Sequence, residues 1–138
     1  MVVCKYCGHV NENRLYCERC SRPLSEELLK DWLLQKYFEN LVMNAESMKE
    51  VLSTRREGEF GNVKADYVIE HTDGSKTLLI VTTKIEEVLD ELIKYNARRR
   101  EKINVVFLRV DTESVPPISH EILREALRHG ITVTYFKA

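Results

Sequence analysis

Beyond Cys20 the chain contains no cysteine, and nowhere does it contain an apolar run of the roughly 20 residues that a membrane helix requires. Its first residues lack the apolar stretch of a signal peptide, because cysteines and charges begin at once. The formal net charge of −1 shows no overall excess of either sign, so only a local cluster of cations can indicate a polyanionic partner. We therefore expect a soluble cytoplasmic globular protein without membrane contact.

The four cysteines form two Cys-x-x-Cys pairs that are separated by nine residues. A secreted disulfide scaffold spreads its cysteines through the fold, whereas confinement to one short segment favours a metal. Each pair can form a tight turn whose N–H groups point at the thiolates, and two such turns complete a tetrahedron. We predict that Cys4, Cys7, Cys17 and Cys20 bind a structural Zn²⁺ ion, with two disulfides or four free thiols as the alternative.

This cysteine segment resembles the short zinc-ribbon modules that begin many bacterial and archaeal proteins. Those modules share an aromatic residue before the second pair, here Tyr16, and a Pro-Leu exit, here Pro23-Leu24. Gly8 follows the first pair, where the chain needs a positive φ. We expect residues 1–24 to form a zinc ribbon that binds nucleic acid, binds protein or stabilises the terminus.

The rest of the chain alternates between helical and strand periodicity. Pro116-Pro117 predicts a break, Ser119 a helix N-cap and Gly130 a left-handed helix end. The expected elements are a helix over about 26–45, a weakly indicated strand over 49–57, strands Asn62–His71 and Lys76–Thr83, a helix over 85–99, strand Ile103–Val110, a helix after Ser119 and strand Ile131–Phe136. This order predicts an α/β domain over residues 25–138, with a mixed sheet that has helices on both faces.

The element order and the segments Gly61–Ile69 and Leu79–Lys84 resemble the PD-(D/E)xK, or restriction-endonuclease-like, superfamily. That superfamily includes type II restriction enzymes and archaeal Holliday-junction resolvases, and the resemblance covers residues from about 26 to 138. Its enzymes hydrolyse phosphodiesters with a divalent metal that is held by carboxylates. The resemblance implies the order α-β-β-β-α-β-α-β, with Asp66 as the first acid and Lys84 as the lysine of the motif.

The geometry of this motif depends on the hairpin loop after His71. A three-residue loop with Gly74 in the left-handed region places Asp66 opposite Ile80, so that Asp66, Thr82 and Lys84 share one sheet face. A two-residue loop moves Asp66 to the other face. The alternative is that Asp66 and Lys84 are ordinary solvated residues of the strand and of the helix flank.

The second acid of the motif is missing, because Thr82 stands in its place. A hydroxyl is a poor Mg²⁺ ligand and carries no charge, so we expect a degenerate site that takes Mg²⁺ only if an acid comes from elsewhere. The candidate replacements are Glu39, Glu46, Glu70, Glu86 and Glu87.

The strongest basic cluster follows the second predicted helix of the domain. Its members are Lys94, Arg98, Arg99, Arg100 and Lys102. These cations can contact phosphates, or they can simply complement the C-terminus of the helix. Trp32 and Tyr37 are expected in the core or an interface, and the apolar Leu34 and Phe38 beside the main stripe leave room for a homodimer.

Three functions follow from these patterns. The favoured one is a zinc-ribbon protein with a catalytically degenerate nuclease-like domain that binds nucleic acid, DNA more than RNA, or a nucleic-acid-processing partner. The others are an active Mg²⁺-dependent nuclease with a relocated acid, and a protein–protein adaptor that contacts no nucleic acid.

Overall fold

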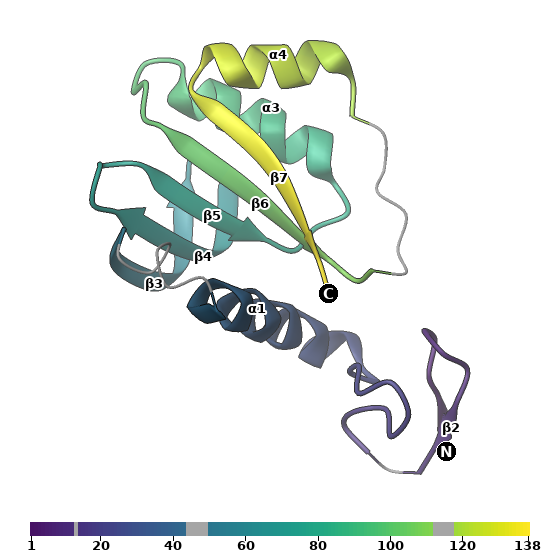
Figure 1. The fold of residues 1–138 in the computed structure, drawn as a ribbon. Helices are drawn as coiled ribbons and strands as arrows, with labels where there is room; N and C mark the ends of the chain where they lie inside the picture. Colours follow the sequence, from purple (N-terminus) through teal and green to yellow (C-terminus); the bar gives the residue numbers. More distant parts are fainter. Residues whose placement is uncertain (13, 44–49, 112–117) are drawn as a thin grey trace.

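The computed structural model describes residues 1–12, 14–43, 50–111 and 118–138 (Figure 1). Several predictions fall outside these residues. They concern the Pro116-Pro117 break, Glu46, the last two residues of the first predicted helix and the first residue of the next predicted strand. The elements are β1 (Val2–Val3), β2 (Val10–Asn11), α1 (Glu26–Met43), β3 (Val51–Phe60), β4 (Val63–His71), β5 (Lys76–Ile80), α3 (Ile85–Asn96), β6 (Ile103–Arg109), α4 (His120–Arg128) and β7 (Ile131–Lys137).

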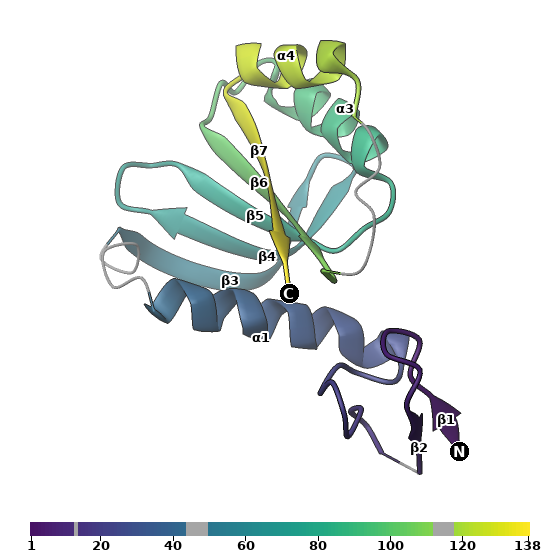
Figure 2. The same cartoon turned by 45° about the vertical axis from the view of Figure 1, so that its right-hand side comes forward.

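The main sheet has five strands in the order β3-β4-β5-β6-β7. The first three strands form an antiparallel meander, and β5, β6 and β7 run parallel to one another. Helix α1 covers one face of the sheet, and α3 and α4 cover the other (Figures 1 and 2). The predicted fold class, a mixed sheet with helices on both faces, is confirmed.

Two apolar cores lie on the two faces of the sheet. In β5, Leu78 and Ile80 belong to the core that contains residues of α3 and α4, whereas Leu79 between them belongs to the core beside α1. All three side chains are at most 3% exposed. A strand that is buried on both faces must be apolar at every position, which is why this segment reads as a continuous hydrophobic run.

Strand β5 ends at Ile80, three residues before the predicted end. The N–H of Val81 donates to Oδ2 of Asp66 at 2.8 Å. The backbone therefore bonds to a side chain where a longer strand would continue, and it then turns into α3.

Helix α3 ends at Asn96, also three residues earlier than predicted. Asn96 is completely buried, its Oδ1 accepts the N–H of Glu101 at 3.0 Å, and its Nδ2 donates to the carbonyls of Glu101 and His129. Arg100 has φ +52°, which ends the helical path. The side chain of Asn96 thus joins the end of α3 to the end of α4.

The predicted signals around α4 are confirmed. Oγ of Ser119 accepts the N–H of Ile122 at 3.3 Å, as an N-cap does. Gly130 has φ +77°, and a Cβ at this position would lie 3.0 Å from the carbonyl oxygen of Glu101. Both the backbone conformation and the close approach therefore require glycine here.

The apolar side chains of α1 that suggested a homodimer lie against the sheet. Leu34 is 8% exposed, and the ring of Phe38 packs 4.8 Å from that of Tyr67, centroid to centroid. Leu34 thus belongs to the core and Phe38 is half-buried, and the homodimer stays a prediction. Trp32 is 9% exposed and Tyr37 packs on Phe136, in agreement with the core expected for them.

Among the helices of the described residues, none has the combination of length and apolar character that crossing a bilayer requires.

Candidate metal centre and nuclease-like cleft

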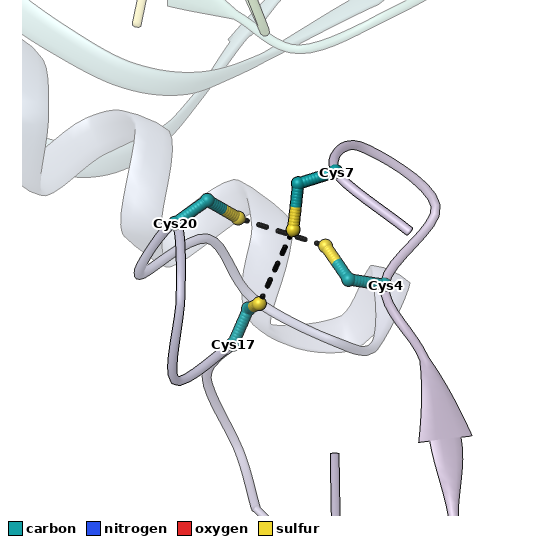
Figure 3. Close-up of side chains that lie close together, drawn as sticks. All are labelled: Cys4, Cys7, Cys17 and Cys20. Atoms are coloured by element: carbon teal, nitrogen blue, oxygen red, sulfur yellow. Dashed lines mark hydrogen bonds between the residues drawn. The ribbon is translucent and has the colours of Figure 1, made fainter. Parts of the chain in front are cut away.

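The four cysteine sulfurs point toward one another between two turns of the N-terminal segment (Figure 3). All four lie within 4.8 Å of one another, and the pairs Cys4–Cys20 and Cys7–Cys17 are each 3.6 Å apart. No disulfide joins them. A tetrahedral Zn²⁺ ion with Zn–S bonds of about 2.3 Å places its sulfurs ~3.8 Å apart, so the arrangement fits a four-thiolate metal site.

The two turns repeat one backbone pattern. The N–H of Cys4 donates to the carbonyl of His9 and the N–H of Gly8 donates to that of Cys4. In the second turn, Cys17 donates to Arg22, and Ser21 donates to Cys17, in the same way. Gly8 and Ser21 have φ +77° and +64°, so the positive φ predicted at Gly8 is present and recurs at Ser21. This repetition places the two cysteine pairs face to face.

Burial, backbone N–H groups and neighbouring sulfurs shift the pKa values of two of the thiols. The pKa of Cys17 is lowered to about 6: burial raises it, but the N–H of Cys20 and the amide of Asn11 lower it by more. The pKa of Cys7 is raised to about 11: the N–H of His9 lowers it, but burial and the sulfurs of Cys17, Cys4 and Cys20 raise it by more. Neighbouring thiolates repel, and a bound cation removes this repulsion.

Asn11 supports the centre from a buried position that the sequence patterns did not reveal. It is 1% exposed, and its Nδ2 donates to Sγ of Cys17 at 3.5 Å and to the carbonyl of His9 at 3.1 Å. Its Oδ1 accepts the N–H of Glu18 at 2.9 Å. Asn11 therefore holds one ligand and connects both turns. Its only sequence signal was a polar residue after apolar Val10.

The β4–β5 hairpin has the register on which the nuclease-like motif depends. The N–H of His71 donates to the carbonyl of Ser75 at 2.9 Å, and Gly74 has φ +90°. Tyr67 pairs with Leu79, and the same register places Asp66 opposite Ile80. The three-residue loop is therefore confirmed.

Asp66, Thr82 and Lys84 line one cleft of about 420 Å³ beside α3. The other charged residues of this cleft are Lys30, Glu57, Lys64, Glu87 and Glu91. The structure thus brings the three motif positions together. With three lysines and four carboxylates, the cleft has one more carboxylate than ammonium groups.

Both oxygens of the Asp66 carboxylate are engaged. Oδ1 lies 2.8 Å from Nζ of Lys30, and Oδ2 accepts the N–H of Val81. The Asp66 side chain is 14% exposed and that of Lys30 is 53% exposed. Lys30 comes from α1, and the hydrogen bond to Asp66 raises its pKa. An ammonium group thus lies against the Asp66 carboxylate.

Thr82 and Lys84 are held mainly through their backbones. Oγ1 of Thr82 accepts the N–H of Lys84 at 3.1 Å, and the carbonyl of Thr82 accepts from Nη1 of Arg109 at 3.4 Å. Lys84 is exposed and precedes α3. Among the residues that the structure describes, only the four cysteines bring three or more candidate metal-ligand atoms this close together.

The candidate replacement acids are mostly engaged elsewhere. Glu86 accepts the N–H of Ser119, Glu70 accepts from Ser53 and pairs with Arg55, and Glu39 pairs with Lys36. Glu87 alone among the described candidates lines the cleft.

None of the five residues of the basic cluster belongs to the lining of this cleft. The carbonyl of Lys102 accepts the N–H of Lys76, at the first residue of β5, whereas Asp66 bonds to Val81, just beyond its last residue. Lys102 and Asp66 therefore lie at opposite ends of this strand, whereas Lys94 lies 3.7 Å from Glu91 of the cleft lining. Lys94 pairs with Asp90 at 3.2 Å, and the guanidinium of Arg99 lies 4.4 Å from the centroid of its helix neighbour Tyr95. Arg98, Arg100 and Lys102 are exposed.

Two solved structures are similar to the chain. One is SfsA of Pyrococcus furiosus in complex with Ca²⁺, with 21% identity, a TM-score of 0.48 and coverage of 76% of this chain and 56% of that one. The other is an EndoMS–double-stranded DNA complex, with 13% identity, a TM-score of 0.40 and coverage of 73% and 43%. The chain thus spans about half the length of these proteins. No protein-family model and no curated protein sequence matches it.

Proposed function

We propose that this chain is a zinc-ribbon protein whose nuclease-like domain binds nucleic acid, DNA more than RNA, without cleaving it. Its units are the ribbon over 1–24 and the α/β domain over 25–138. The observation that carries the proposal is the engagement of Asp66 by Lys30 at 2.8 Å, together with Thr82 at the position of the second acid. Mg²⁺ requires several oxygen ligands in near-octahedral geometry. A single carboxylate that is already paired with an ammonium group supplies too few of them.

The ribbon's contribution in this proposal is structural. Four thiolates occupy every position of a tetrahedral ion, so a bound Zn²⁺ would have no site left for water or substrate. Cys4, Cys7, Cys17 and Cys20 would hold it, and the ion would supply cohesion to a segment that has little apolar core of its own.

Exposed cations support binding to nucleic acid. The cluster of Lys94, Arg98, Arg99, Arg100 and Lys102 can contact phosphates without any metal. Such contacts give affinity that depends on salt and little on base sequence.

The test combines cleavage and binding on the zinc-loaded full chain. Duplex, single-stranded and branched DNA and RNA are incubated with Mg²⁺ or Mn²⁺, and binding is followed by fluorescence anisotropy at increasing salt. We expect salt-dependent binding and intact substrate. Asp66→Ala is the key variant, and Asp90→Ala, a carboxylate outside the cleft lining, is its control.

Two results would overturn the proposal. Cleavage that disappears in Asp66→Ala but not in Asp90→Ala would establish an active nuclease, with Glu87 as the first acid to examine. Absence of any salt-dependent binding would favour the protein–protein adaptor.

A further inference from the structure

The ribbon is attached to the α/β domain by specific contacts. Tyr6 packs against the core beside α1, and Arg22 forms an ion pair with Asp111, which follows β6. The Arg22 guanidinium also lies 5.5 Å from the centroid of the Tyr6 ring. Figure 2 shows the ribbon beyond the N-terminal end of α1. These contacts set where the remaining side chains of the first cysteine turn lie.

Lys5, between Cys4 and Tyr6, lines a groove between the ribbon and the domain. The groove has a volume of about 310 Å³, and its polar and charged lining residues are Lys5, Lys30, Thr82, Thr83 and Arg109. It shares Lys30, Val81 and Thr82 with the nuclease-like cleft. The two depressions are therefore adjoining parts of one surface, and Lys30 stands at their boundary.

The charges of the two parts differ in sign. Three cations line the ribbon groove, and no carboxylate belongs to its lining among the described residues. The cleft beside it has more carboxylates than lysines. Two acids lie nearby: Asp111 is paired with Arg22, and Asp66 is paired with Lys30 of the groove. Lys5 is exposed and can reach a ligand directly, whereas Arg109 is 7% exposed and donates to the carbonyl of Thr82.

We propose that this ribbon groove is the main phosphate-binding site for the nucleic-acid backbone, with Lys5 and Lys30 as the contacting ammonium groups. The inference rests on the proposed function and specifies its site. A phosphodiester backbone is attracted more to the cationic groove than to the adjoining cleft, where four carboxylates face three lysines. The Thr82 and Thr83 hydroxyls of the groove can also donate to it. A bound zinc ion would then affect nucleic-acid binding indirectly, because it would fix the turn that carries Lys5.

The experiment compares two cations of the same ribbon. Lys5→Gln removes the groove cation, and Arg19→Gln removes an exposed cation of the second cysteine turn that is not among the described groove residues. Binding of a fluorescent DNA oligonucleotide is measured by anisotropy across a salt series, and the zinc content of each protein is determined. We expect Lys5→Gln to weaken binding about tenfold and to lower the salt slope by about 1, with zinc retained. Arg19→Gln should bind like wild type, and Lys5→Arg should restore affinity.

A second variant tests the role of ribbon position. Tyr6→Ala loosens the ribbon without removing a charge, so it should weaken binding as well. Because it displaces Lys5, Tyr6→Ala/Lys5→Gln should bind no more weakly than the weaker single variant. If the losses of binding free energy in the two single variants add fully in the double variant, Tyr6 does not act by positioning Lys5.

The outcomes separate the two proposals. If Lys5→Gln binds like wild type while the triple variant Arg98→Gln/Arg99→Gln/Arg100→Gln loses affinity, nucleic-acid binding stands and the groove site is wrong. Equal losses in Lys5→Gln and Arg19→Gln would also overturn the groove, since net charge alone would then explain them. If the wild-type chain does not bind the DNA oligonucleotide, the proposed function itself is wrong.

Discussion

Nζ of Lys30 lies 2.8 Å from Oδ1 of Asp66, and this ion pair joins α1 to the strand that carries the first acid of the nuclease-like motif. The two residues are 36 positions apart in the sequence, so the contact exists only in the folded domain. It places a positive charge against the carboxylate that we propose as the remnant of a metal site. Lys30 also stands between the acid-rich cleft and the cationic ribbon groove.

Removing the Lys30 ammonium should expose the carboxylate to metal. Lys30→Met is expected to bind Mn²⁺ more tightly than wild type, by about tenfold, because Asp66 loses its competing cation. Stability should fall by only ~0.5 kcal/mol, since the lysine is half exposed and such pairs contribute little. Calorimetric Mn²⁺ titration of the zinc-loaded protein measures the first effect and urea unfolding the second. Lys36→Met, which breaks the exposed pair with Glu39, is the control. Equal Mn²⁺ affinity in all three proteins would contradict the prediction.

Restoring the missing acid should restore a metal site. Thr82→Glu adds a carboxylate to the cleft that holds Asp66, and we expect tighter Mn²⁺ binding and the appearance of Mn²⁺-dependent cleavage. Thr83→Glu adds the same charge one residue further along and should do neither. Cleavage by Thr82→Glu should disappear again in the double variant with Asp66→Ala. Cleavage that survives that double variant would show that the assigned alignment is wrong.

The zinc centre should depend on Asn11. Its amide holds the Cys17 sulfur and both cysteine turns, so Asn11→Ala is expected to lower zinc affinity by about 10- to 100-fold. Competition with a chromophoric chelator measures this affinity, and the wild type should bind one zinc per chain. The neighbouring exposed Glu12 offers a control in Glu12→Ala. If the zinc affinity of Asn11→Ala equals that of the wild type, the Asn11 amide does not contribute to metal binding.

Two glycines with similar backbones allow the cost of a close contact to be measured. Gly74 and Gly130 have φ +90° and +77°, but a Cβ at Gly74 meets nothing within 4 Å, whereas one at Gly130 lies 3.0 Å from the Glu101 carbonyl. Gly74→Ala should cost about 1 kcal/mol through backbone strain alone. Gly130→Ala should cost about 2–3 kcal/mol, because strain and overpacking combine. Urea unfolding of both variants gives the difference, and equal losses would refute the packing argument.

Local sequence signals determined much of this protein. The spacing of the four cysteines, the alternation of the strands, the loop after His71, the Ser119 cap and Gly130 depend on neighbours a few residues away. Backbone conformation and side-chain periodicity are local properties, which is why the element order and the hairpin register follow from them. The ends of the elements were predicted less accurately. Asn96 binds the carbonyl of His129 where α3 ends, and Asp66 binds the N–H of Val81 just after β5 ends. Both bonds join segments that are far apart in the sequence.

Tertiary structure alone decided what each charged or apolar group faces. It set Lys30 against Asp66, buried Leu34, packed Phe38 against Tyr67, and placed Lys102 at the other end of β5 from Asp66. It also placed Lys5 of the ribbon beside Lys30. These relationships depend on how helices and strands pack across long sequence separations, and residue spacing within one element carries no information about that packing. The four-cysteine site is therefore readable from the sequence, whereas the electrostatics of the cleft and the groove are not.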